Sequence, residues 1–242
     1  YTAYDEPPDF SPSAVHDSVE GSLRRLRSDY LDLLQLHNPD PRAPGLDETF
    51  EALHRLREKG KIRAFGVSLS APEDGEEFLE RFDISAIQVN LNLLDQRADT
   101  IGLLERALGA GISIIARTPL CFGFLAGEVD PKRVFDVRDH RSRWPRVQIR
   151  RWVEGNRMFQ EDVAAKSGQP LPQVALRYCL SHHAVASVIP GIMTAEEARD
   201  NAAASDAEPL TPEELDLIRG LYARHEFFVE QAERPSPEID RG

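Results

Sequence analysis

Hydrophobic positions along this chain occur either in short continuous runs or in stripes spaced three to four residues apart. The short runs are typical of buried strands, and the spaced stripes are typical of amphipathic helices. Five runs predict strands at residues 31–36, 62–68, 84–90, 112–118 and 186–192. Because helical patterns separate these runs from residue 11 to about residue 192, we expect repeated βα units around a parallel sheet.

The ends of several helices are also visible in the sequence. Ser11 and Pro12 suit the cap and the first position of a helix. Its expected apolar stripe consists of Val15, Val19, Leu23 and Leu26. Further helices are predicted at residues 47–59, before Gly60, and at residues 98–108. Two more are expected: one whose inward face carries Trp152, Phe159 and Val163, and one that begins at the capping box of Thr211.

The number of strands is too small for a closed barrel. A (β/α)8 barrel has eight strands and about 250 residues, and this chain of 242 residues opens with no strand before its first helix. At about 30 residues per βα unit, three absent units correspond to about 90 residues upstream. We therefore predict an α/β fold of the (β/α)8 TIM type that is incomplete in this chain. Its partial barrel domain covers residues 1–225, and a loosely ordered tail covers residues 226–242.

Composition narrows the classes of partner. The chain has 29 Lys and Arg against 41 Asp and Glu, a formal net charge of -12, without a basic stripe that suits a phosphate backbone. We expect neither nucleic acid nor a membrane as partner, since no run of 18 apolar residues and no leader is present. Cys121 and Cys179 lack the spacing of a disulfide framework or a zinc site, which favours a cytoplasmic, reducing setting.

His37 is the first candidate catalytic residue. It follows the apolar run at residues 31–36, and the C-terminal ends of strands carry the active site in parallel α/β barrels. The alternative is that His37 only ends a buried strand. A metal-dependent hydrolase would need several histidine or acidic ligands at strand ends, and His37 alone qualifies, while the adjacent His182 and His183 lack ligand partners at suitable spacing. We therefore predict no metal site.

Five segments together resemble the successive signatures of the aldo-keto reductases. In chain order they read DYLDLLQLHNP, GKIRAFGVS, IQVNLNLLDQ, RTPLCFGFLAG and VIPG with a later DN. This family is an eight-stranded (β/α) barrel that transfers hydride between NADPH and a carbonyl without a metal. The resemblance, over about residues 10–221, implies an NAD(P)H-dependent reductase of an aldehyde or ketone, with NADPH or NADH as cofactor and a small carbonyl compound as substrate.

The resemblance also implies roles for individual residues in the first half of the chain. His37 corresponds to the histidine that orients the carbonyl, whereas the Asp, Tyr and Lys of the family belong to strands upstream of this chain. Ser68 and Gln88 correspond to residues that hold the nicotinamide carboxamide, and Leu69 replaces a usual asparagine. The alternative for Gln88 is a polar residue of the barrel interior, and Asn90 lies on the same strand face.

Further cofactor contacts are implied in the second half. Arg117 stands where many members place an aromatic ring, and a guanidinium can stack on a ring, pair with a phosphate or pair with a carboxylate. The implied pyrophosphate loop contains Pro119, Leu120, Gly123 and Gly127, although its glycines also suit simple turns. The implied adenosine contacts are Gly191, Arg199, Asp200 and Asn201.

The rival function is a catalytically inactive cofactor-binding or regulatory protein on the same scaffold, because a fold can keep a cofactor site without its chemistry. Upstream strands that carry Asp, Tyr and Lys would favour the enzyme. The sequence predicts neither the particular carbonyl substrate nor the oligomeric state.

Overall fold

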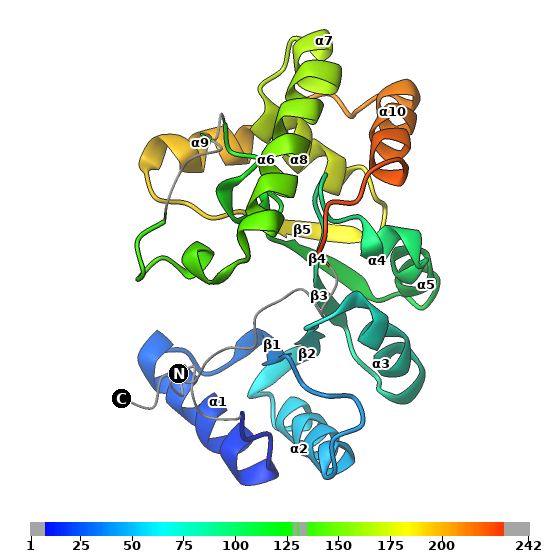
Figure 1. Ribbon diagram of the computed structural model, residues 1–242. Coiled ribbons are helices and arrows are strands. Elements are labelled where there is room, and N and C mark those ends of the chain that lie inside the picture. Colours follow the sequence, from blue (N-terminus) through cyan, green and yellow to red (C-terminus); the bar gives the residue numbers. More distant parts are fainter. Residues whose placement is uncertain (1–7, 128–129, 131–134, 230–242) are drawn as a thin grey trace. The chain divides into compact units, whose positions relative to one another are not determined.

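The computed structural model describes residues 8–127, 130 and 135–229, and the chain divides into two compact units. The first unit contains the described residues up to 89 together with 98–115, and the second contains residues 90–97 and the described residues from 116 onward. Among the described residues, five strands follow one another in the order β1-β2-β3-β4-β5, with helices between consecutive strands (Figure 1). The predicted βα alternation is confirmed.

The strands agree with the predicted runs except at their ends. They are β1 (Leu31–His37), β2 (Ile62–Ser68), β3 (Ala86–Asn90), β4 (Ser113–Arg117) and β5 (Val185–Ile189). β2 pairs in parallel with β1 and with β3. β5 ends before Pro190, which has no amide hydrogen to extend a ladder. β1 is less buried than predicted, with Leu36 alone inside, because it lies at the edge of the strand order.

Helices of the first unit begin and end at residues that the sequence indicates. α1 (Pro12–Leu26) starts at Ser11, whose side chain accepts a hydrogen bond from the amide of Ala14 at 3.3 Å. Its predicted stripe is buried except for Leu26, which is 64% exposed. α2 (Leu46–Glu58) is followed by Gly60, which adopts the expected left-handed conformation with φ +69°. Both helices lie on the same side of β1 and β2 in Figure 1.

One predicted helix is wrong. Residues 98–108 form two helices, α4 (Arg97–Thr100) and α5 (Leu103–Gly109), because Gly102 between them has φ +76° and interrupts the α conformation. The sequence analysis also did not identify α3 (Gly75–Arg81). The core of this unit contains the ring of Phe50, which stacks on Phe82 with 3.9 Å between ring centroids.

The second unit is mostly helical. A continuous segment contains α6 (Arg146–Phe159), a π-helical turn at Gln160–Ala164 and α7 (Ala165–Ser167), and its predicted inward residues Trp152, Phe159 and Val163 are all buried. The remaining helices are α8 (Leu171–Leu180), α9 (Ala195–Ala203) and α10 (Pro212–Ala223). α10 begins with the predicted capping box at Thr211.

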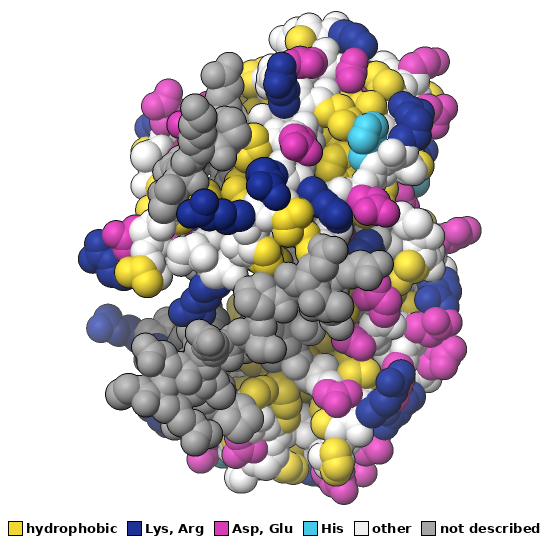
Figure 2. Space-filling view, viewed as in Figure 1, with side chains coloured by type: hydrophobic (Ala, Val, Ile, Leu, Met, Phe, Trp, Pro, Cys, Tyr) yellow, Lys and Arg dark blue, Asp and Glu magenta, His cyan; other side chains and the backbone are white. Residues whose placement is uncertain are grey.

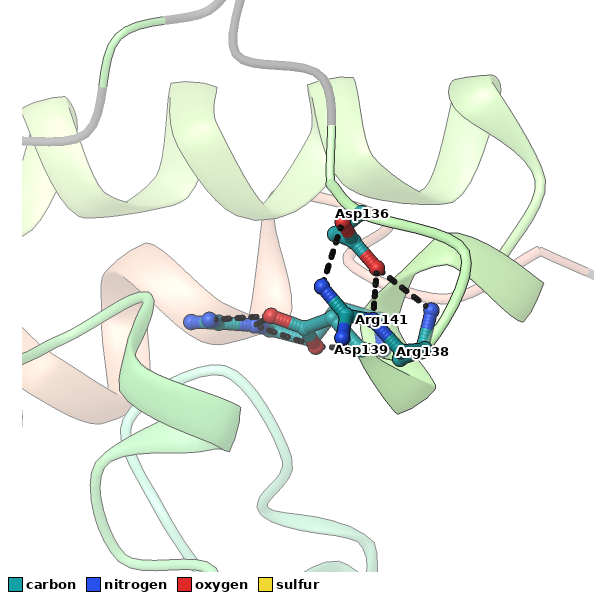
Figure 3. A pocket seen from close by; sticks show the side chains of 4 residues that line it. All are labelled: Asp136, Arg138, Asp139 and Arg141. Carbon is teal, nitrogen blue, oxygen red and sulfur yellow. Dashed lines mark hydrogen bonds and ion pairs between the residues drawn. The ribbon is translucent and has the colours of Figure 1, made fainter.

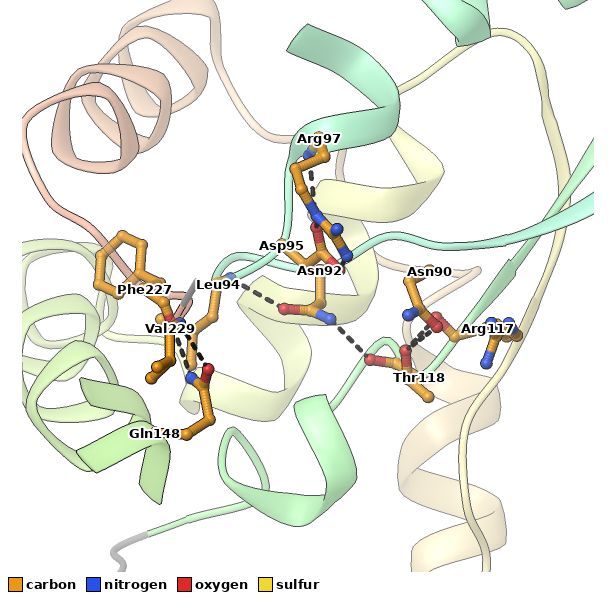
Figure 4. Close-up of polar contacts among 10 residues, drawn as sticks. All are labelled: Asn90, Asn92, Leu94, Asp95, Arg97, Arg117, Thr118, Gln148, Phe227 and Val229. Carbon is orange, nitrogen blue, oxygen red and sulfur yellow. Dashed lines mark hydrogen bonds and ion pairs between the residues drawn. The ribbon is translucent and has the colours of Figure 1, made fainter. Parts of the chain in front are cut away.

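The segment after α10 is more ordered than the predicted tail. Phe227 and Val229 are buried, although the sequence analysis placed them in the tail. The side chain of Gln148 donates to the carbonyl of Phe227 at 2.6 Å and accepts from the amide of Val229 at 2.9 Å (Figure 4). The apolar residues of this segment pack into the unit, whereas residues 230–242 lie outside the described part.

Burial also determines the state of the two cysteines. Cys121 and Cys179 are free and buried. Burial raises the pKa of both thiols, and the Asp95 carboxylate raises the pKa of Cys121 further. Both thiols are therefore protonated at neutral pH and poorly suited to nucleophilic chemistry.

The surface carries charges of both signs. On the face shown in Figure 2, Lys and Arg side chains are interspersed with Asp and Glu side chains. No helix in the described ranges combines the length and the apolar character that a membrane crossing requires.

Candidate functional site

Three predicted residues lie side by side on β1, β2 and β3: His37 and Ser68 end their strands, and Gln88 lies two residues before the end of β3. In the strand register Ser68 is the partner of His37 on one side and of Gln88 on the other. Residues paired in this way in a parallel sheet project to the same face, so the three side chains form one row. All three belong to the first unit. The fold thus brings together the candidate catalytic residue and the two residues assigned to the carboxamide.

Hydrogen bonds orient the amide of Gln88. Its Nε2 donates to the hydroxyl of Ser68 at 3.0 Å, and its Oε1 lies 3.5 Å from Nε2 of Gln35, at the outer limit of a hydrogen bond. Oε1 of Gln35 is buried without a hydrogen-bond partner among the described residues. The sequence analysis missed Gln35, although its place two residues before His37 puts both side chains on one face of the strand.

The two residues that flank the row have separate backbone and packing roles. Asn38 adopts φ +55°, and its amide donates to the carbonyl of Ser68 at 2.8 Å, which anchors the chain directly after His37. Leu69 is 1% exposed and therefore belongs to the core. Because its aliphatic side chain has no hydrogen-bonding group, Leu69 cannot replace the amide contact of the usual asparagine. Ser68 is also buried, at 2% exposed, whereas His37 is exposed.

In the second unit, Arg117 ends β4 and is half-buried. Burial lowers the pKa of its guanidinium, and the attraction of Asp95 opposes that shift. The sequence analysis left a ring, a phosphate or a carboxylate as partner of Arg117, and the structure places the carboxylate of Asp95 near its guanidinium. Asn90, which the sequence analysis placed on the strand face of Gln88, accepts a hydrogen bond at Oδ1 from the hydroxyl of Thr118 at 2.9 Å.

The loop that follows contains the residues assigned to the pyrophosphate. Pro119 is buried and Leu120 is half-buried. Gly123 has φ +88°, and its amide already donates to the carbonyl of Leu120 at 2.9 Å. Gly127 has φ +153° and open space where a side chain would begin. Both glycines thus occupy conformations that other residues rarely adopt, and Gly127 leaves the backbone accessible.

The residues assigned to the adenosine lie at the exposed surface of the second unit. The side chain of Asn201 donates to the carbonyl of Gly191 at 3.4 Å, which brings these two together. The carbonyl of Asp200 accepts a hydrogen bond from Gln173. Arg199 is exposed, and its guanidinium donates to the carbonyl of Ala195 at 3.4 Å.

A shallow depression at residues 136–141 offers little to a ligand (Figure 3). Its charged side chains form two pairs, Asp136 with Arg138 and Asp139 with Arg141, with shortest contacts of 3.0 and 2.6 Å. Arg141 also donates to the carbonyl of Phe122 at 3.3 Å. Within the described ranges, no group of three or more His, Cys, Asp or Glu side chains is arranged to hold a metal.

Comparison with known proteins identifies relatives along most of the chain. The model of the aldo/keto reductase family matches residues 1–223. YqkF of Bacillus subtilis (strain 168), an uncharacterized oxidoreductase, is 31% identical over 214 residues, which cover 87% of this chain and 66% of the relative. The L-glyceraldehyde 3-phosphate reductase of Escherichia coli O157:H7 is 30% identical over 226 residues, which cover 89% of this chain and 65% of the relative. The chain spans from about half to about two-thirds of the length of the curated relatives it matches.

Solved structures give the same result. The holo form of aldo-keto reductase AKR11C1 from Bacillus halodurans is 30% identical with a TM-score of 0.74, and the match covers 94% of this chain and 72% of that one. The glycerol dehydrogenase AKR11B4 from Gluconobacter oxydans is 30% identical with a TM-score of 0.78, and the match covers 93% of this chain and 68% of that one. The predicted α/β barrel class is confirmed, and the resemblance of the five segments is explained. The chain belongs to the aldo/keto reductase family.

Proposed function

We propose that the protein binds NADPH or NADH and transfers hydride to the carbonyl carbon of a small aldehyde or ketone. The row of His37, Ser68 and Gln88 carries this proposal, because strand register alone places an imidazole beside an amide and a hydroxyl. The similarity to aldo-keto reductases supports the same reaction class.

The polar groups of the row fit a nicotinamide carboxamide, which has one hydrogen-bond donor and one acceptor group. Gln88 directs its amide nitrogen to Ser68 and retains a second hydrogen, while the hydroxyl of Ser68 can both donate and accept. The buried, unpartnered Oε1 of Gln35 shows that the cluster has unused acceptor capacity among the described residues. We infer that Gln88 and Ser68 hold the carboxamide, while loop 118–127 and residues 199–201 bind the pyrophosphate and the adenosine.

His37 has the chemistry to orient the substrate. The bound nicotinamide supplies the hydride. When hydride reaches a carbonyl carbon, negative charge develops on the oxygen and must be stabilised and then protonated. The proton would come from the tyrosine that the family resemblance assigns to the upstream strands. The imidazole of His37 can donate a hydrogen bond to that oxygen and so hold the carbonyl in one orientation. This assignment requires no metal ligand from the chain.

Replacing Gln88 with alanine is expected to weaken NADPH binding by a few-fold to about tenfold, because losing one hydrogen bond to a polar group commonly costs about 0.5 to 1.5 kcal/mol. Titration of NADPH against the tryptophan fluorescence of the protein measures the dissociation constant. Gln169→Ala is the matched control, since Gln169 is exposed. Unchanged NADPH affinity in Gln88→Ala would place the carboxamide elsewhere. If the wild type binds NADPH tightly but reduces no carbonyl compound, the rival regulatory function is favoured.

The protein is expected to prefer NADPH over NADH by less than about a hundredfold, or about 2.7 kcal/mol. The carboxylate of Glu197 accepts hydrogen bonds from the amides of Met193 and Thr194 at 2.6 and 3.2 Å, so negative charge already occupies the amino end of α9. Arg199 is the one Lys or Arg between residues 190 and 201, and Glu197 precedes it by two residues. Charge at a helix end commonly contributes about 0.3 to 1 kcal/mol.

Dissociation constants for both cofactors at one ionic strength test this expectation. Glu197→Gln keeps an oxygen for the cap but removes its charge, so its NADPH affinity should rise about two- to fivefold relative to its NADH affinity. A preference above a hundredfold in the wild type would show that other cations bind the 2′-phosphate.

A further inference from the structure

The loop assigned to the pyrophosphate begins at a strained residue. Thr118 has φ +53°, a conformation that β-branched residues rarely adopt and that persists only where surrounding contacts hold it. Its hydroxyl lies 2.9 Å from Oδ1 of Asn90 and 2.7 Å from the carbonyl of Arg117. Its carbonyl accepts hydrogen bonds from the side chain of Asn92 at 3.0 Å and from the amide of Cys121 at 2.8 Å. These contacts determine the direction in which the loop leaves β4.

Asn92 is itself held firmly. It is 2% exposed, and its Oδ1 accepts a hydrogen bond from the amide of Leu94 at 2.9 Å, which leaves Nδ2 to donate to Thr118 (Figure 4). The backbone groups of Asn92 and Asp95 exchange two hydrogen bonds of 3.1 Å. Asp95, 2% exposed, forms a two-pronged ion pair with Arg97, with both distances 2.8 Å. The turn at residues 92–97 is therefore a rigid support for Thr118.

A second asparagine holds the far end of the same loop. Asn156 on α6 is 6% exposed, and its Nδ2 donates to the carbonyl of Phe124 at 2.7 Å and to that of Gly127 at 2.9 Å. It lies four residues after Trp152 and three before Phe159, so it is a polar residue on the buried face of the helix. A buried amide at such a position has to satisfy its hydrogen bonds within the protein.

We propose that Asn92 and Asn156 are positioning residues that hold loop 118–127 in the conformation that receives the cofactor pyrophosphate. This inference rests on the proposed function and extends it to two residues to which the sequence analysis gave no role, although Asn92 lies within the segment IQVNLNLLDQ. A loop that is ordered before binding avoids the entropy cost of ordering it with the ligand. If the competent conformation falls to one-tenth of the population, the apparent dissociation constant rises tenfold.

Hydrogen–deuterium exchange and cofactor titration together test the proposal. In Asn92→Ala and in Asn156→Ala we expect faster exchange, by about tenfold, at the hydrogen-bonded amides of residues 121–125 in the cofactor-free protein. The dissociation constant for NADPH should rise about tenfold, whereas turnover at saturating NADPH should change less than about twofold. A role confined to general stability would accelerate exchange throughout the unit. It would not raise the dissociation constant for NADPH while leaving turnover at saturating NADPH unchanged.

Two further variants sharpen the test. Thr118→Gly removes the conformational cost at φ +53°. Relative to Thr118→Gly alone, the double variant with Asn92→Ala should therefore have an NADPH dissociation constant only about two- to threefold higher. Gln148→Ala is the matched control, because Gln148 is a buried amide on the same helix that holds residues 227–229 instead. Its exchange should accelerate at residues 227–229, and its NADPH affinity should match the wild type.

The possible failures are distinguishable. Unchanged exchange at residues 121–125 in both alanine variants would overturn the positioning role, whether or not cofactor binds. Accelerated exchange with an unchanged dissociation constant would show that the asparagines hold the loop but not for the cofactor, and would also overturn the proposal. If the wild type binds neither NADPH nor NADH, the proposed function fails, and the cofactor role of the two asparagines fails with it.

Discussion

Replacing His37 with alanine is expected to lower the turnover of an aldehyde substrate by about 10² to 10³-fold while changing NADPH affinity less than about twofold. Removing one donor that stabilises a developing oxyanion commonly has a kinetic effect of this size. His37 ends β1 next to Ser68 in the register, with an exposed side chain that can reach a ligand. Steady-state kinetics at saturating NADPH, with a separate cofactor titration, give the two quantities.

Two variants control this experiment. His16→Ala removes an exposed histidine on α1 that pairs with Asp17 and should leave turnover unchanged. His37→Gln retains a hydrogen-bond donor near the same place and should recover part of the lost turnover. Equal losses in turnover and cofactor affinity, or wild-type turnover in His37→Ala, would contradict the proposed orientation of the carbonyl.

Replacing Gly66 with alanine is expected to destabilise the fold by about 3 kcal/mol or more. The added methyl group would overlap the carbonyl oxygen of Ala86 and lie 2.9 Å from the carbonyl carbon. Because Gly66 and Ala86 are register partners in β2 and β3, the obstacle is backbone, and relief requires the strands to separate. Overpacking a core commonly costs about 1 to 3 kcal/mol, and total stabilities are about 5 to 15 kcal/mol.

Urea unfolding followed by circular dichroism measures this change. Gly109→Ala is the matched control, because the glycine ends α5 without a positive φ and has no atom within 4 Å of the added methyl group. The control should equal or exceed the wild-type stability by up to about 1 kcal/mol, since alanine favours the helix. A free energy of unfolding of Gly66→Ala within 1 kcal/mol of the wild type would show that β2 and β3 can move apart without loss.

The row of His37, Ser68 and Gln88 was predictable because its members follow short-range rules. The apolar run at residues 62–68 defines β2 without reference to the rest of the chain, and His37 stands directly after an apolar run of its own. Caps were predictable for the same reason, since Thr194 and Thr211 satisfy amides only three residues away. Their partners lie within one turn of helix, so local sequence contains both sides of each hydrogen bond.

By itself, the sequence determined the βα alternation, the family resemblance and the residues at strand ends. Only the tertiary structure decided that helix 98–108 is divided at Gly102, that Leu69 is buried in the core and that Asn92 and Asn156 hold loop 118–127. Asn92 and Asn156 bond to residues 26 and 32 positions away. No local pattern specifies such partners, because they meet only when separate elements pack and a buried amide must find its hydrogen bonds within the protein.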